Sequence, residues 1–194
     1  RVLMLVHRNF VRSGAALKGE NREKFQTITR KLADIGTRFS QNLLNDERDW
    51  FMKLDNKNLE TLPSFLVQAL NQAGKDRGIN QAVLTLSRSL ITPFLQFCSD
   101  RALRELAYVA WTKRGANEGD RNNVKLAYET LKLRAQMAKI LGYASYSHYK
   151  LDTEMASSPE NVDKLLTTVW GPARKAAIKD EAILSSLMRQ DGIG

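Results

Sequence analysis

The sequence predicts a mainly α-helical protein, a multi-helix antiparallel lobe with one small two-stranded β ribbon. Apolar residues recur every three or four positions through most of the 194 residues, which is the spacing of one face of an α-helix. Only two short segments, 50–55 and 82–86, have the aromatic or β-branched composition of strands. No internal repeat is present, which argues against a solenoid. We expect one helical lobe over residues 1–194, subdivided near residues 49–87.

The N-terminal part predicts two helices. Residues 1–12 are typical of the end of a helix that breaks near Ser13 and Gly14. A long helix then runs from about Asn21 to residues 45–48 and docks along a partner helix. Its apolar seam consists of Phe25, Ile28, Leu32, Ile35 and Phe39. Gly36 lies inside this helix at a cost of about 1 kcal/mol relative to Ala, which indicates close helix packing.

The next part predicts a strand, a helix and a second strand. Residues 50–55 form the first strand, a loop follows at residues 56–58, and a helix begins at Pro63. Its buried face is predicted to contain Phe65, Leu66, Ala69, Leu70 and Ala73. Residues 82–86 can pair with the first strand and so complete the ribbon.

The central part predicts two helices joined by a polar loop. The first follows Ser99 or Asp100, either of which can cap it, and the loop covers residues 115–123. The first helix carries an apolar stripe of Leu103, Leu106, Ala107, Ala110 and Trp111, and the second carries Val124, Ala127, Tyr128, Leu131, Ala135, Ala138 and Leu141. We expect these two helices to pack as an antiparallel pair.

The C-terminal part begins with an aromatic turn at residues 143–149 that enters a short helix. Ser158, Pro159 and Glu160 then mark a clear helix start, since serine caps, proline suits the first turn and an acid complements the dipole. The predicted buried face contains Val162, Leu165, Leu166, Val169 and Trp170. A kink is expected at Gly171–Pro172.

Three segments in the central part carry a family resemblance. Residues 99–105 read Ser-Asp-Arg-Ala-Leu-Arg-Glu, residues 110–114 read Ala-Trp-Thr-Lys-Arg, and residues 133–146 read Leu-Arg-Ala-Gln-Met-Ala-Lys-Ile-Leu-Gly-Tyr-Ala-Ser-Tyr. In this order they resemble the thimet oligopeptidase family of zinc metallopeptidases. The upstream segments 10–15 and 38–42 resemble the peptidyl-dipeptidase branch best.

The resemblance implies a hydrolase that cuts short peptides and releases dipeptides from their C-terminus. It also implies a zinc ion that activates water, a glutamate base, and a helical lobe that forms one wall of a substrate channel. These functions require a His-Glu-x-x-His helix, in which two imidazoles one turn apart reach the same metal. The sequence contains only His7 and His148, far apart.

We therefore expect the chain to be a fragment of a larger peptidase that lacks the catalytic part. No catalytic, metal-binding or cofactor-binding residue is assigned, zinc is expected in the parent protein alone, and the fragment is expected to be inactive. Tyr143, Tyr146, His148 and Tyr149 are the candidates for lining the channel. Packing between helices is the alternative interpretation of these aromatic residues.

The formal net charge of +9 leaves a second function open. A basic helical module could bind nucleic acid or an acidic partner through clustered Lys and Arg residues. Acidic residues are interleaved along the chain, however, which favours a solvated helical surface and peptides as partners rather than nucleic acid.

Cellular context and self-association follow from a few further residues. No apolar run reaches the roughly 20 residues of a membrane span, so no membrane partner is expected. Cys98 is the only cysteine and is predicted to be buried, which fits a reducing compartment such as the cytoplasm. Trp170, Ile183 and Leu187 are candidates for exposed apolar residues through which copies of the chain associate.

Overall fold

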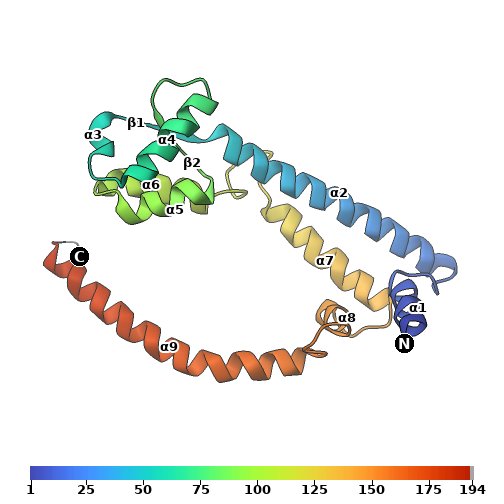
Figure 1. Ribbon diagram of the computed structural model, residues 1–194. Helices are drawn as coiled ribbons and strands as arrows, with labels where there is room; N and C mark the ends of the chain where they lie inside the picture. Colours follow the sequence, from blue (N-terminus) through green and yellow to red (C-terminus); the bar gives the residue numbers. More distant parts are fainter. Residues whose placement is uncertain (193–194) are drawn as a thin grey trace. The chain divides into compact units, whose positions relative to one another are not determined.

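The computed structural model describes residues 1–192 and divides into two compact units, residues 26–133 and residues 1–25 together with the segment from 134 onward. Ile193 and Gly194, the end of the expected lobe, lie outside the described residues. In chain order the elements are α1 (Val2–Arg12), α2 (Gly19–Asp49), β1 (Phe51–Leu54), α3 (Asn56–Leu59), α4 (Ser64–Asp76), β2 (Ala82–Thr85), α5 (Arg88–Phe97), α6 (Arg101–Thr112), α7 (Val124–Ile140), α8 (Tyr146–Leu151) and α9 (Pro159–Gln190) (Figure 1). Nine helices and one two-stranded sheet within residues 1–192 confirm the predicted fold class.

The two predicted strands form the expected ribbon inside the 26–133 unit. β1 and β2 are antiparallel, with Phe51 opposite Thr85 and Leu54 opposite Ala82. The segment expected to be a loop at residues 56–58 instead forms the single turn of α3, because the Asn58 side chain accepts a hydrogen bond from the Asp55 amide at 3.0 Å.

The core of the 26–133 unit lies between the ribbon and the helices α4, α5 and α6. It consists of Leu54, Leu62, Leu66, Leu70, Ala82, Leu84, Leu86, Leu90, Ile91, Phe94, Cys98 and Ala107. Leu66 and Leu70 confirm the predicted buried face of α4, whereas Phe65 and Ala69 are exposed. Phe65 instead contacts Phe97 edge-to-face, with ring centroids 6.2 Å apart.

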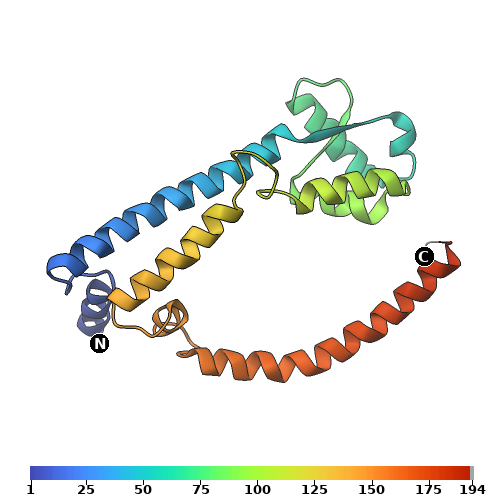
Figure 2. The same cartoon turned by 180° about the vertical axis from the view of Figure 1, so that it is seen from behind.

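The predicted antiparallel pairing of α6 with α7 is wrong. α6 packs against α5, while both views show the first part of α7 beside α2 (Figures 1 and 2). The reason is that the loop between the two helices is anchored to α2. The Asn123 amide group donates a hydrogen bond to the Phe39 carbonyl oxygen at 3.0 Å, and its oxygen accepts one from Asn42 at 2.8 Å.

The predicted buried face of α7 is also wrong for most positions. Val124, Tyr128 and Leu131 are exposed, and the buried residues are Leu126, Leu133 and Ala138. Apolar residues surround much of this helix, so their spacing does not select one face. The neighbouring helix decides which of them is covered.

In α2 the seam is confirmed at Phe25, Ile28 and Ile35, which are buried. The inference from Gly36 is wrong, because a Cβ atom added at this position would meet nothing within 4 Å. Gly36 lies on an open part of the helix surface.

In the other unit, α9 is one long helix that starts where predicted. The Ser158 hydroxyl accepts a hydrogen bond from the Asn161 amide at 3.3 Å, and the helix continues without a break through Pro172. The predicted buried face is wrong, since Leu165, Leu166, Val169 and Trp170 are exposed and Val162 is only partly buried. None of the residues of α9 is buried.

Candidate functional site

The structure brings the predicted channel residues together around the short helix α8. Tyr143 and Tyr149 meet edge-to-face with ring centroids 5.4 Å apart, and Tyr146 lies 5.8 Å from Tyr149. All three tyrosines and His148 are partly buried. The cluster therefore forms one aromatic surface rather than separate side chains.

Arg12, at the end of α1, holds this aromatic cluster. Its guanidinium group donates hydrogen bonds to the Tyr143 hydroxyl at 2.9 Å, to the Asp152 carboxylate at 2.7 Å and to the Tyr149 carbonyl oxygen at 2.6 Å. It also lies over the Tyr149 ring, 4.3 Å from the centroid. The side chain is only 11% exposed, so its charge is matched by a carboxylate, two further acceptors and an aromatic face.

Tyr143 is polarised by the same contacts. Burial raises the pKa of its phenol, and the hydrogen bond from the hydroxyl to Asp152 raises that pKa further. The hydroxyl is thus kept protonated and engaged within the cluster.

The contacts of His148 are with Ser145 and Glu160 rather than with the tyrosine rings. Its Nδ1 atom pairs with the Ser145 hydroxyl at 2.8 Å, and its Nε2 atom lies 3.7 Å from the Glu160 carboxylate at the start of α9. The imidazole therefore connects α8 to α9 and retains one partly exposed edge.

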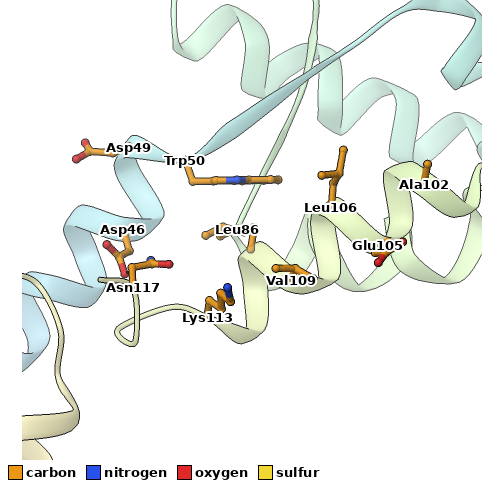
Figure 3. Close-up of a pocket in the computed structure, with 11 residues that line it drawn as sticks. Asp46, Asp49, Trp50, Leu86, Ala102, Glu105, Leu106, Val109, Lys113 and Asn117 are labelled. Atoms are coloured by element: carbon orange, nitrogen blue, oxygen red, sulfur yellow. The ribbon is translucent and has the colours of Figure 1, made fainter. Parts of the chain in front are cut away.

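The structure also contains a groove that the sequence did not predict. It has a volume of about 840 Å³ and lies in the 26–133 unit, between the end of α2 and α6. Its walls consist of Asp46, Asp49, Trp50, Leu86, Ala102, Glu105, Leu106, Val109, Ala110, Lys113 and Asn117. Figure 3 shows the Trp50 ring extending toward Leu106, with Asp46 and Asn117 together at one end.

Asp46 shapes one end of this groove. It is 9% exposed, and its carboxylate accepts hydrogen bonds from the Gly115 amide at 2.8 Å and the Asn117 side chain at 2.9 Å. An acidic residue in the last turn of a helix opposes the helix dipole. That unfavourable position is the one sequence signal that could have indicated a tertiary role for Asp46.

Asp49 borders the same groove as an ionised group. Hydrogen bonds from Arg48 and Arg121 lower the pKa of its carboxyl group to about 2. The charge of this carboxylate is balanced by the two arginines, and the apolar part of the groove wall consists of Trp50, Leu86, Ala102, Leu106, Val109 and Ala110. Lys113 also lines the groove, so its walls carry charges of both signs.

The residues present do not fit a zinc site. The whole sequence supplies two histidines, of which His7 is exposed on α1 and His148 is held by Ser145 and Glu160. Across residues 1–192, no group of three or more His, Cys, Asp or Glu side chains is placed to hold a metal ion.

Cys98 is buried, as predicted. Burial raises the pKa of its thiol, and its sulfur lies 3.7 Å from the Asp100 carbonyl oxygen. This environment is typical of a structural cysteine rather than a nucleophile. Among the described helices, none is long and apolar enough to cross a membrane.

Comparisons with known proteins agree with the expected family. The profile described as Peptidase family M3 matches residues 94–193, just over half of the chain. Oligopeptidase A of Haemophilus influenzae is 33% identical over 160 residues, which is 80% of this chain and 24% of that protein. A probable cytosolic oligopeptidase A of Arabidopsis thaliana is 34% identical over 194 residues, 94% of this chain and 27% of that protein.

A third relative bears on the branch of the family. Dipeptidyl carboxypeptidase of Escherichia coli is 26% identical over 197 residues, 99% of this chain and 29% of that protein. The two oligopeptidases A have the higher identities, so the resemblance is shown for the family and not for the peptidyl-dipeptidase branch. The chain spans about a quarter of the length of these relatives. Together with the profile match, these alignments show that the chain belongs to Peptidase family M3.

Proposed function

We propose that this chain is a non-catalytic helical part of a zinc-dependent peptidase that hydrolyses short peptides. The observation that carries the proposal is the family match over residues 94–193 in a chain that spans about a quarter of its relatives. On this proposal the metal ligands and the catalytic base belong to the rest of the parent protein. The cytoplasm is the proposed location, which the lone buried cysteine favours.

The proposed contribution of this chain is to shape one wall of the substrate channel. The aromatic surface of Tyr143, Tyr146, His148 and Tyr149 is suited to this role because Arg12 and Asp152 hold it in place. Rigid aromatic edges can restrict the width of a channel without contacting the bond that is cut. Such a wall admits short extended peptides and excludes folded proteins.

Two modes of cleavage remain as specific proposals. Release of dipeptides from the C-terminus is supported by segments 10–15 and 38–42 and by the alignment of 99% of the chain with a dipeptidyl carboxypeptidase. Internal cleavage is supported by the higher identity with the oligopeptidases A. Mass spectrometry of the products that the complete protein forms from one peptide distinguishes them, since successive dipeptides support the first mode and internal fragments the second.

The decisive experiment is to express the complete coding sequence that contains this chain. We expect a His-Glu-x-x-His motif downstream, peptide cleavage that a chelator abolishes, and about one zinc per molecule. The 194-residue chain alone is expected to show neither cleavage nor bound zinc. A complete protein without the motif, or chelator-sensitive cleavage by the chain alone, contradicts the proposal.

The net charge of +9 favours a basic binding module as the second candidate. A mobility-shift assay with nucleic acid over a salt series tests it, because phosphate contacts give strongly salt-dependent affinity. We expect no binding at near-physiological salt. Tight, salt-dependent binding there supports the second candidate instead.

A further inference from the structure

Helix α9 contains a glycine–proline pair near its middle. Gly171 and Pro172 lie within one continuous helix, which both views show as gently bowed (Figures 1 and 2). Because proline has no amide hydrogen, the Thr168 carbonyl oxygen lacks its intrahelical donor, and the proline ring crowds that oxygen. The Thr168 hydroxyl also donates a hydrogen bond to the Lys164 carbonyl oxygen at 2.8 Å, a contact that tends to bend helices. The helix is therefore weakest at residues 168–172.

No packing holds this weak point straight. Every residue from 163 to 184 is exposed, and a Cβ atom added at Gly171 would meet nothing within 4 Å. Relative to alanine, proline costs about 3 kcal/mol inside a helix and glycine about 1 kcal/mol. None of the residues of α9 is buried, so no tertiary contact of a core side chain offsets this cost. The straight form of α9 is therefore only weakly favoured over a bent one.

The proline in α5 is in the opposite situation. Pro93 also lies inside a helix, but Ile91 and Phe94 beside it are fully buried and Leu90 is 7% exposed. These neighbours belong to the core of the 26–133 unit, and their packing fixes the direction of α5 at its proline. Proline thus occurs in a packed helix and in an unpacked one, and only the unpacked helix is free to bend.

A glycine before the proline keeps both forms of α9 accessible. A residue that carries a Cβ atom is disfavoured in the helical conformation before proline, because that atom clashes with the proline ring. Gly171 has no Cβ atom, so it adopts the helical conformation before Pro172 without this clash and adopts others as readily. The pair can therefore continue the helix or bend it.

We propose that Gly171 and Pro172 form a hinge about which residues 173–190 change direction relative to residues 159–170. The first segment is tied to α8, because the Glu160 carboxylate lies 3.7 Å from the His148 imidazole. A hinge needs changes in only a few backbone dihedral angles, so both segments stay helical as the angle between them changes. The hinge does not depend on the proposed peptidase function.

Residual dipolar couplings of the backbone amides test the hinge in the 194-residue chain. In a dilute oriented medium they report how strongly each helical segment aligns. We expect helical chemical shifts in both segments and a smaller alignment magnitude for residues 173–190 than for residues 159–170, because motion about the hinge averages the couplings. The double variant G171A/P172A restores the missing amide hydrogen and is expected to give both segments the same alignment.

Gly36→Ala is the matched control, because it removes a helical glycine with equally open surroundings that no proline follows. It is expected to leave the couplings of α9 unchanged. Three results overturn the proposal: equal alignment of the two segments in the wild type, a difference that persists in G171A/P172A, or non-helical chemical shifts throughout residues 173–190.

Discussion

Gly74 shows most clearly how one residue limits the packing of the ribbon. It lies inside α4, and a Cβ atom there would stand 1.9 Å from the Gln81 carbonyl oxygen, which precedes β2. The end of a flexible side chain could move away from the added atom, but this backbone oxygen cannot move without shifting the chain at Gln81. We expect Gly74→Ala to lower the free energy of unfolding by about 1–3 kcal/mol, the usual cost of overpacking.

Gly36→Ala is the control for Gly74→Ala. It is expected to raise the free energy of unfolding, whereas Gly74→Ala is expected to lower it. Gly36 is helical, and nothing lies within 4 Å of the added atom, so the lower entropy of the unfolded chain stabilises by about 0.5–1 kcal/mol. Urea unfolding followed by circular dichroism measures both variants. Equal midpoints for the two variants would show that the close contact at Gly74 is absent in solution.

Asp49 provides a residue-scale prediction about pH. Hydrogen bonds from Arg48 and Arg121 lower the pKa of its carboxyl group from 3.8 to about 2. A lowered folded-state pKa stabilises the fold above the unfolded-state pKa near 4, and this contribution is lost as the pH falls toward 2. The stability difference between the wild type and Asp49→Asn is expected to be constant above pH 4 and to shrink below it. Carboxyl NMR titration gives the pKa directly, and a midpoint near 4 contradicts the prediction.

At the scale of elements, Arg12 connects α1 to α8. Its guanidinium group makes three hydrogen bonds and lies over a ring, whereas a lysine offers a single ammonium group without the planar fork. We expect Arg12→Lys to destabilise by about 1–3 kcal/mol, the range for hydrogen bonds of charged groups. Arg8→Lys is the matched control, because Arg8 is exposed on the same helix. Hydrogen exchange of the α8 amides measures the effect. We expect faster exchange in Arg12→Lys and no change in Arg8→Lys. Equal exchange rates in the two variants would contradict the role of Arg12.

Most helices and strands were predictable from the sequence, but which elements pack against each other was not. The start of α9 follows from local chemistry at Ser158, and the cap of α6 is Asp100, whose carboxylate accepts a hydrogen bond from the Leu103 amide at 3.1 Å. α5 was not predicted, because Pro93 lies inside it. The pairing of α6 with α5 was missed because the contacts that redirect the chain, such as Asn123 with Phe39, join residues far apart in sequence.

The candidate site also has parts that could be predicted from neighbouring residues and parts that depend on contacts between distant residues. The tyrosines of the aromatic cluster are close in sequence, so their common location was predictable. Arg12 lies more than 130 positions away from Tyr143, and no local sequence pattern indicates that the two residues are in contact. In the groove, Leu106 belongs to the apolar stripe of α6 and was expected in the core, but it is 59% exposed as part of the groove wall.

At the scale of the whole molecule, the two units differ in how much apolar surface they bury. Of the buried apolar residues in the described chain, all except Phe25 and Ala138 belong to the 26–133 unit. A helix as long as α9 with no buried residue has little tertiary packing to stabilise it. The opening free energies of the two units therefore differ.

Native-state hydrogen exchange measures this difference. Amides of α4, β2 and α5 are expected to exchange slowest, close to the rate of global unfolding, and those of residues 165–188 fastest in dilute protein. Protection in α9 equal to that in α4 would show that tertiary packing stabilises α9, contrary to the exposure of Leu165, Trp170 and Leu184.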